Sequence, residues 1–300
     1  MKIVIAGGTG YLGELLINHF LKDKKNSIYI LSRKQLINTG RVSYLKWNGS
    51  TEGYWTNLLE GTDVLINLTG KSVNCSYTEA NKAVIYSSRI DSTNLLCNVV
   101  QKLKFPPKVF IQSSSATIYR HSEDLLMTER KGEIGTDFSM DVCKKWETTF
   151  NSFHLPKTTK IITRTSIVMG NNGGAFPIIK RLTKFGFGGK QGNGNQFISF
   201  ITEEDYVNAI EFLIDKEAGV YNLCVPNPIK NKDFQKKLRQ KMNCFIGIPT
   251  PKFLLKIGGI IIGTEAELIL KSRKVYPEKL LEKGFEFSTS NFDEFCSFVA

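Results

Sequence analysis

Three glycines near the start of the chain have the spacing that binding of a dinucleotide requires. Gly7, Gly10 and Gly13 follow a β-branched run, residues 2–6, and precede apolar residues at helical intervals. In a strand–turn–helix unit the first glycine permits the turn, the second admits a pyrophosphate, and the third lets helix and strand pack closely. Amides at the helix N-terminus favour phosphate charge. We therefore predict dinucleotide contacts from Gly7, Thr9, Gly10, Tyr11, Leu12 and Gly13.

The residues after the second expected strand, 27–31, indicate which dinucleotide binds. An acidic residue at this place would bind the ribose 2′-hydroxyl of NAD(H), whereas a cation would accept the 2′-phosphate of NADP(H). Here the chain has Ser32, Arg33 and Lys34 and no acid. We therefore predict NADP(H), with Arg33 as the main ligand because a guanidinium grips phosphate with two hydrogen bonds. Two solvated loop cations are the alternative.

Elements that could position these residues alternate along the chain. Strands are expected at 42–47, 63–67, 109–112 and 160–165, and helices at 77–103 and 137–153. This alternation is typical of an α/β fold with a doubly wound parallel sheet, the Rossmann type. Ligands of such sheets lie over the carboxyl ends of the strands. Small residues after the fourth strand let the backbone pass a cofactor, which predicts contacts from Leu68, Thr69 and Gly70.

The pattern changes after Gly170. Glycines become frequent, a strand is expected at 196–201, a helix at 203–214 and a strand at 220–224, and the rest is largely helical with loops. We predict an NADP(H)-binding domain at 1–170, re-entered at about 196–224. A smaller, mostly helical substrate-side lobe comprises 171–195 and 225–300. The apolar run 253–263 is expected to be a core helix or lobe element, because it is roughly half as long as a bilayer-spanning helix.

Composition argues against several classes of partner. The net charge is +12, but lysines and arginines are scattered and no nucleic-acid-binding module is present. The six cysteines form no C-x-x-C pair and no cluster with metal-ligand spacing. With the first strand at residue 2 there is also no targeting segment. We expect a cytoplasmic protein with reduced thiols, and no metal, nucleic-acid or membrane partner.

Longer motifs carry a resemblance to a known family. The glycine loop 7–13, the segment 63–70 and the run from Ser113 to Tyr119 resemble motifs of extended short-chain dehydrogenases/reductases, the NAD-dependent epimerase/dehydratase type. More narrowly, the chain is similar to the subgroup called epimerase family proteins, which has a C-terminal domain of unknown function. Segments that match this subgroup are 164–170, 192–201 with Asp205, Gly263 to Glu265, and 277–287.

The resemblance implies a chemistry and further site residues. Members of this superfamily transfer hydride between nicotinamide and a carbinol carbon, and a tyrosine transfers the proton while a lysine four residues later lowers its pKa. Ser115 takes the position of the serine that holds the reacting oxygen. Ser113, Ile167 and Val168 are implied as cofactor contacts. The resemblance also makes a homodimer possible.

The tyrosine–lysine pair is missing from this chain. None of the ten tyrosines has a lysine four positions later, and the expected pair falls on Ser139 and Cys143. Tyr119, on the loop beside Ser115, could replace the proton donor or could equally pack in the core. Asp141, Lys144 and Lys145 are further substitutes, although a solvated helix face explains the two lysines better.

Two functions therefore stay open at this point. One is an NADP(H)-dependent reductase or epimerase that acts on a small or sugar-like substrate. The other is a regulatory or sensor protein that binds NADPH without turnover.

Overall fold

The computed structural model describes residues 1–171, 173–255 and 270–298. Its centre is a seven-stranded sheet in the order β11-β7-β5-β4-β1-β2-β3, in which every neighbouring pair is parallel. The strands are β1 (Lys2–Ala6), β2 (Ser27–Ser32), β3 (Val42–Lys46), β4 (Val64–Asn67), β5 (Val109–Ser115), β7 (Thr159–Thr165) and β11 (Gly219–Leu223). The Rossmann-type α/β fold expected from the sequence is confirmed.

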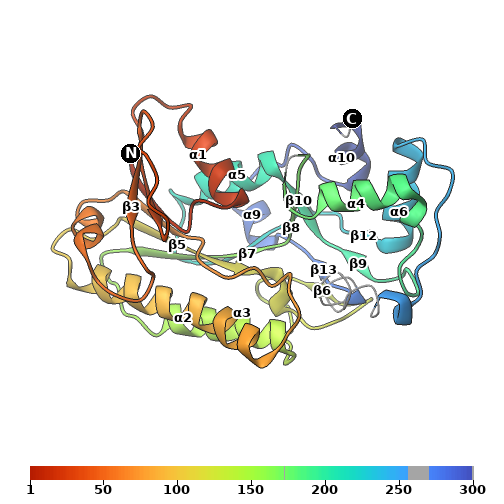
Figure 1. Cartoon of the computed structure of the whole chain (residues 1–300), viewed down its shortest axis with the longest axis horizontal. Helices are drawn as coiled ribbons and strands as arrows, with labels where there is room; N and C mark the ends of the chain where they lie inside the picture. Colours follow the sequence, from red (N-terminus) through yellow and green to blue (C-terminus); the bar gives the residue numbers. More distant parts are fainter. Residues whose placement is uncertain (172, 256–269, 299–300) are drawn as a thin grey trace.

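Helices cover both faces of this sheet (Figure 1). α2 (Glu79–Lys102) and α3 (Phe138–Asn151) lie on one face, and α1 (Tyr11–Phe20) and α5 (Glu203–Leu213) lie on the other. Alternate residues of β1 serve the two faces, as the pleat requires. Ile3 and Ile5 pack in the α1–α5 core, whereas Val4 packs in the α2–α3 core.

A smaller lobe lies beyond the carboxyl ends of the strands (Figure 1). It contains α4 (Phe176–Leu182), a π-helical turn η3 (Thr183–Phe187), α6 (Asn231–Lys241) and α10 (Phe292–Phe298). These elements pack around an aromatic core that includes Phe200, Phe234 and Phe292. A short helix, α9 (Glu278–Glu282), packs against β11 instead.

Short strands connect the lobe to the body. β6 (Leu126–Met127) pairs with β13 (Lys274–Val275), β8 (Ile167–Met169) with β10 (Phe200–Thr202), and β9 (Phe197–Ile198) with β12 (Ile229–Lys230). The described residues also contain two 3-10 turns, η1 (Tyr54–Leu59) and η2 (Ala116–Ile118).

The strand expected at 196–201 differs from the prediction. It is divided at Ser199 into β9 and β10, and neither half joins the central sheet. The Ser199 hydroxyl donates to the Arg273 carbonyl at 2.8 Å and accepts from the Val275 amide at 2.9 Å, which holds the backbone against β13. The central sheet is therefore re-entered through β11, and the domain limits stay a prediction.

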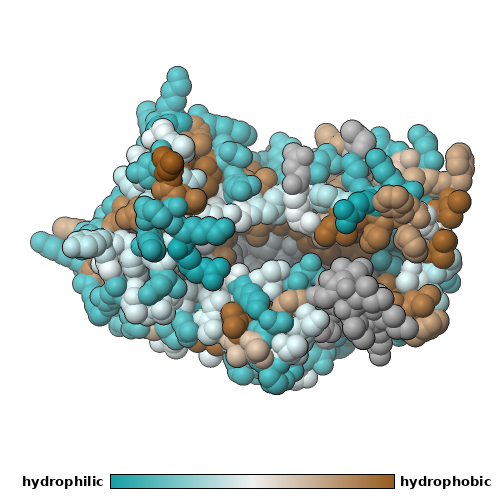
Figure 2. Space-filling model, viewed as in Figure 1, coloured by the Kyte–Doolittle hydropathy of each residue, from teal (hydrophilic) through white to brown (hydrophobic). Residues whose placement is uncertain are grey.

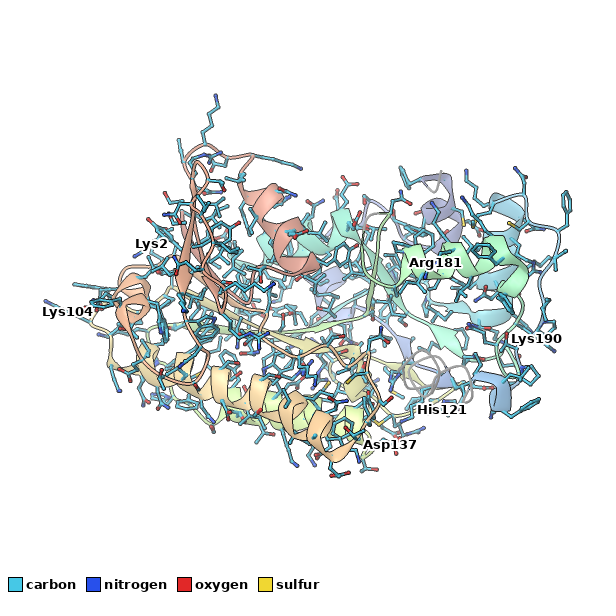
Figure 3. The ribbon with its side chains drawn as sticks, in the orientation of Figure 1. Lys2, Lys104, His121, Asp137, Arg181 and Lys190 are labelled. Carbon is cyan, nitrogen blue, oxygen red and sulfur yellow. The ribbon has the colours of Figure 1, made fainter. Side chains whose placement is uncertain are left out.

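Surface cations are dispersed over the molecule. Figure 3 shows Lys104 at one end of the molecule, Lys190 at the other, and Lys2 and Arg181 apart from both. In the described part of the chain, no helix combines the length and apolar character needed to cross a bilayer. Residues 256–269 lie outside the described residues, and they include Glu265 and most of the apolar element expected at 253–263.

Candidate functional site

The glycine-rich turn between β1 and α1 is built to leave one side open. Gly7 has φ +75°, and a Cβ there would lie 3.0 Å from the Thr69 nitrogen. A Cβ on Gly13 would lie 2.2 Å from the Gly8 carbonyl oxygen, so only glycine lets α1 pack this closely. Around Gly10, by contrast, a Cβ would meet no atom within 4 Å. The N-terminus of α1 is thus open where a phosphate group would approach.

A cleft of about 400 Å³ extends from this turn over the ends of β4, β5 and β7. Figure 2 shows the molecule hollowed between the part that carries α1 and the part that carries α2 and α3. The predicted site residues that line the cleft are Tyr11, Leu12, Leu68, Gly70, Ser113, Ser115, Ile167 and Val168. Gly7, Thr9, Gly10, Gly13 and Thr69 belong to the adjoining turns and are not among the lining residues.

Tyr11 fixes one wall of the cleft. Its hydroxyl donates to Glu203 Oε1 at 2.7 Å, which joins α1 to α5. Burial, with help from Glu203, raises the pKa of Tyr11 well above its ordinary value, so the phenol stays protonated. A Cβ on Gly173 would lie 2.3 Å from the Tyr11 ring, and a Cβ on Gly170 would lie 1.8 Å from the Glu203 carboxyl carbon. Gly170 and Gly173 are therefore glycines because a side chain at either position would collide with Glu203 or Tyr11.

A second hollow, of about 450 Å³, lies beside the end of β2. Arg33 and Lys46 line it together with Trp47 and Trp55, whose rings are 5.4 Å apart in an edge-to-face arrangement. Ser32 is buried, and its hydroxyl accepts the Lys34 amide at 3.1 Å, so this serine shapes the turn. Of the three predicted residues, the structure places Arg33 alone in the wall of the hollow.

Ser115 is held in a defined orientation at the end of β5. Its hydroxyl donates to Thr117 Oγ1 at 2.9 Å and accepts the Thr117 amide at 3.1 Å. Both residues line the cleft. The Ser115 hydroxyl is thus held by Thr117 in the wall of the cleft, at the end of β5.

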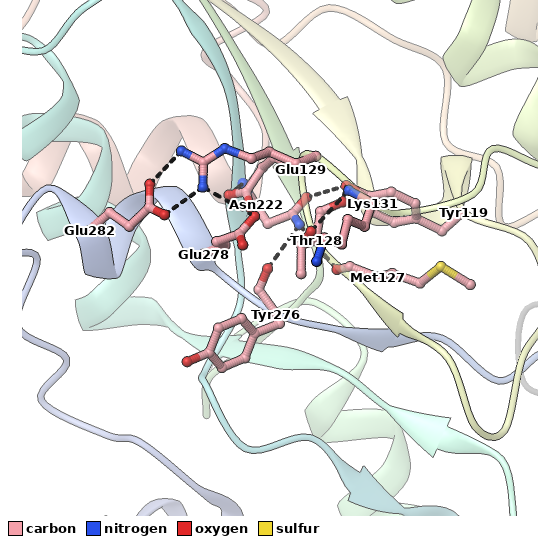
Figure 4. Close-up of polar contacts among 10 residues, drawn as sticks. Tyr119, Met127, Thr128, Glu129, Lys131, Asn222, Tyr276, Glu278 and Glu282 are labelled. Carbon is pink, nitrogen blue, oxygen red and sulfur yellow. Dashed lines mark hydrogen bonds and ion pairs between the residues drawn. The ribbon is translucent and has the colours of Figure 1, made fainter.

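Tyr119 lies outside the cleft. Its side chain is fully buried, and its hydroxyl lies 2.8 Å from Asn222 Oδ1 and accepts from Arg164 Nη1 at 2.9 Å. Figure 4 shows its contacts with Asn222 and with the Thr128 carbonyl oxygen. Burial raises the pKa of Tyr119 to about 12, although Arg164 opposes this. This position argues against the proton-donor role considered for Tyr119 and fits its alternative, core packing.

The residues at the positions of the missing pair do face the cleft. Ser139 and Cys143 line it from α3, one helical turn apart. Burial raises the pKa of the Cys143 thiol to about 12, which keeps it neutral. The cleft therefore has a hydroxyl and a neutral thiol where relatives of the superfamily type would place a phenol and an ammonium group.

The other substitutes on α3 are directed elsewhere. Lys145 forms an ion pair with Asp141 at 2.8 Å and lies over the Tyr86 ring at 4.6 Å. Neither Asp141, Lys144 nor Lys145 is among the residues that line the cleft. They form the solvated face of the helix, as the spacing of the sequence indicated.

Two charged residues in the cleft, Arg89 and Lys71, were not singled out from the sequence. Arg89 reaches the cleft from α2, its guanidinium carbon 5.0 Å from the centre of the Trp146 ring. Arg89 lies on the same face of α2 as Ile85, Ser92 and Leu96, and all three of these residues are buried. A cation on a helix face whose other residues point into the core is unusual, and this signal in the sequence could have identified Arg89 as a site residue.

These features define a class, an α/β protein with a Rossmann-type sheet, an open glycine-rich turn after β1 and a cleft over the strand ends. The sequence model of the NAD dependent epimerase/dehydratase family matches residues 3–137, and that of a domain of unknown function, DUF1731, matches residues 250–299. An epimerase family protein of Staphylococcus aureus is 31% identical over 292 residues, with 97% of this chain and 96% of that protein covered. One of Staphylococcus haemolyticus is 32% identical over 293 residues, with the same coverage. The chain belongs to the NAD-dependent epimerase/dehydratase family, as its motifs indicated.

Solved structures share the fold. Human epimerase family protein SDR39U1 (isoform 2), crystallised with NADPH, has a TM-score of 0.86 at 23% identity and covers 100% of this chain and 99% of its own. A nucleoside-diphosphate sugar epimerase from Corynebacterium glutamicum has a TM-score of 0.78 at 24% identity, with 99% of this chain and 57% of that chain covered. UDP-glucuronic acid 4-epimerase from Bacillus cereus, in complex with UDP-glucuronic acid and NAD, has a TM-score of 0.75 at 15% identity and covers 97% of this chain and 95% of its own.

Proposed function

We propose that the protein binds NADP(H) across the two hollows and acts as a reductase or epimerase on a small or sugar-like substrate. The observation that carries this proposal is the open approach to Gly10 at the N-terminus of α1, which leads directly into the cleft. The human relative of known structure contains NADPH. Because Arg33 lines the second hollow and no acid follows β2, Arg33 accepts the 2′-phosphate.

Each part of the site has a role in this proposal. The bound nicotinamide supplies or accepts the hydride. Leu68 and Gly70 border its place after β4, and Ile167 and Val168 border it after β7. Ser115 donates a hydrogen bond to the reacting oxygen of the substrate when its proton turns away from Thr117 Oγ1, and the Thr117 amide keeps the Ser115 oxygen in position.

A non-catalytic NADPH sensor is the second candidate function. It is favoured by Ser139 and Cys143, which provide neither the phenol nor the ammonium group of the usual pair. In that case the same cofactor site would report NADPH occupancy through the conformation of the lobe.

The two functions separate in one assay. The protein is incubated with NADPH and a panel of aldehydes, ketones and sugars, and the near-ultraviolet absorbance of reduced nicotinamide is followed. The reductase proposal expects its loss, with a roughly 10²-fold slower rate for Ser115→Ala because one hydrogen bond to the developing charge is removed. An epimerase returns the hydride to its substrate without net loss of cofactor, so it is detected instead as conversion of a sugar to its epimer. Ser87→Ala, on the exposed face of α2, is the control and retains the wild-type rate. Binding of NADPH with neither consumption nor epimer formation supports the sensor, and no binding contradicts both functions.

A further inference from the structure

The cleft contains an uncompensated positive charge on its α2 side. The charged residues among its described lining are Arg89 and Lys71, and no carboxylate lines it. Lys71 Nζ donates to the neutral Asn81 Oδ1 at 2.6 Å. Arg89 Nη1 donates to the Ile85 carbonyl at 3.0 Å. In the described ranges of the chain, neither cation has a carboxylate within ion-pair distance.

Arg89 is more than a solvated surface cation. Its guanidinium is half-buried, stacked at 5.0 Å on Trp146, and burial lowers its pKa, which Cys143 and Tyr77 oppose. Taking a charge out of water without a counter-charge costs stability. A guanidinium has five N–H donors, and a single backbone carbonyl accepts from it here. The remaining donors match the two oxygens of a carboxylate or phosphate.

The backbone around Arg89 makes room for this charge. A Cβ on Gly70 would lie 2.9 Å from the Arg89 guanidinium carbon, so a side chain at position 70 would displace it. Arg89 therefore lies beside the turn that follows β4. The open N-terminus of α1, at Gly10, belongs to a different turn, the one that follows β1. Ser72 also lines the cleft.

We propose that Arg89 and Lys71 form an oxyanion subsite, and that the substrate of this cleft carries a carboxylate or phosphate group. The inference rests on the proposed function, because it places that group beside the carbon that exchanges hydride with the cofactor. The substrate class is a small hydroxy or oxo acid, or a sugar phosphate. Its acidic group lies between Arg89 and Lys71, and its reacting oxygen lies toward Ser115.

Trp146 provides a direct readout of this subsite. The chain has three tryptophans, and the other two lie in the second hollow, so Trp146→Phe identifies the signal that comes from the cleft. Protein saturated with NADPH is titrated with inorganic phosphate and, separately, with acetate, at constant ionic strength against chloride. We expect a saturable change in fluorescence with one or both oxyanions, and the tighter of the two identifies phosphate or carboxylate as the group recognised.

Variants test the assignment to Arg89. Arg89→Met should weaken oxyanion binding about ten- to hundredfold. Arg89→Lys keeps the charge but not the planar fork and should weaken it less. Arg181→Gln, a loss of the same charge on the exposed side of α4, should leave it unchanged. Because the buried charge is uncompensated, Arg89→Met without ligand should have a melting temperature equal to or above that of the wild type.

Three results would overturn the proposal, and none of them coincides with failure of the proposed function. They are unchanged oxyanion binding in Arg89→Met, no binding of either oxyanion by wild-type holoprotein, and loss of NADPH binding in both Arg89 variants, which would assign Arg89 to a cofactor phosphate. The proposed function fails separately, if the wild type itself does not bind NADPH in the same cuvette.

Discussion

At the scale of single residues, the glycines of the first turn separate folding from cofactor binding. Gly13→Ala would place a methyl group 2.2 Å from the Gly8 carbonyl oxygen, and we expect it to lower the free energy of unfolding by about 1–3 kcal/mol. Gly10→Ala meets open space, so it should fold as the wild type does and yet lose NADPH affinity, since its methyl group occupies the phosphate position. Thermal melting and NADPH titration of both variants check this. Normal NADPH binding by Gly10→Ala would show that the phosphate does not bind beside Gly10.

Tyr119 is expected to matter for stability and not for turnover. Tyr119→Phe removes a hydroxyl that contacts Arg164 and Asn222 in the core, and leaving these groups without it should cost about 1–3 kcal/mol. The rate of NADPH consumption per folded molecule should not change. Urea unfolding and the turnover assay measure the two quantities. A variant of wild-type stability that lost its turnover would restore Tyr119 as the proton donor.

The sequence indicated the glycine-rich turn more directly than the residues on the other side of the cleft. Strand, turn and helix signals are local, so Gly7, Gly10 and Gly13 could be assigned functions directly. Tyr119 is adjacent to Ser115 in the chain, but the 3-10 turn η2 between them directs its ring into the core. Arg89 was missed because its role depends on contacts with Trp146 and Gly70, from two other segments.

At the scale of elements, α3 is fixed to the sheet by a buried ion pair. Glu147 of α3 accepts from Arg164 of β7 at 2.9 Å and 2.7 Å, and from the Ser114 hydroxyl at 2.6 Å. Burial by itself lowers the pKa of Arg164, but the hydrogen bonds and charge of Glu147 outweigh burial and raise it. Since α3 also carries Ser139, Cys143 and Trp146, this pair positions one wall of the cleft.

Breaking the buried pair should be far more costly than breaking an exposed one. We expect Arg164→Met to lower the free energy of unfolding by about 3–5 kcal/mol, because Glu147 is left charged and unpaired. The matched control is Lys145→Met, which breaks the exposed pair with Asp141 on the same helix and should cost less than about 1 kcal/mol. Urea unfolding followed by circular dichroism compares them. Equal losses would mean that the buried pair does not anchor α3.

The expected strand at 196–201 shows what an element's own sequence leaves open. Its apolar residues are indeed covered, since Phe200 and Ile201 are fully buried and Phe197 is half-buried. Which strands it pairs with is decided by Ser199 and residues more than seventy positions away, Arg273 and Val275. The main parallel strands were easier to predict because their continuous apolar runs are signals within the strand's own sequence.

At the scale of the whole molecule, the C-terminal segment returns to the central sheet beside Glu129 (Figure 4). Glu129 Oε1 accepts the Asn222 amide of β11 at 2.8 Å, while neighbouring Arg130 binds Glu278 and Glu282 of α9. Burial raises the pKa of Glu129 above its ordinary value of 4.5, and Glu278 adds to this. Glu278 and Glu282 thus join α9 to the Rossmann domain through Arg130, while burying the charge of Glu129 costs stability.

This arrangement gives a pH dependence of known sign. A carboxyl group whose pKa is raised in the folded state stabilises the fold when protonated, and this stabilisation is lost as the pH rises through the raised value. Glu129→Gln keeps an acceptor for Asn222 and should therefore raise the melting temperature at pH 7, with the gain disappearing below pH 4.5. Arg130 lowers the pKa of Glu282, so Glu282→Gln should have the opposite, destabilising sign at pH 7. A loss of stability in Glu129→Gln at pH 7 would contradict this interpretation.

Equilibrium titration of the purified protein with NADPH and with NADH tests the cofactor assignment most directly. We expect NADPH to bind at least about tenfold more tightly than NADH, because the 2′-phosphate gains charge-assisted hydrogen bonds from Arg33. Arg33→Ala should abolish most of that preference, whereas Lys34→Ala, outside the wall of the second hollow, should retain it. Equal or tighter binding of NADH by the wild type would contradict the assignment of NADP(H).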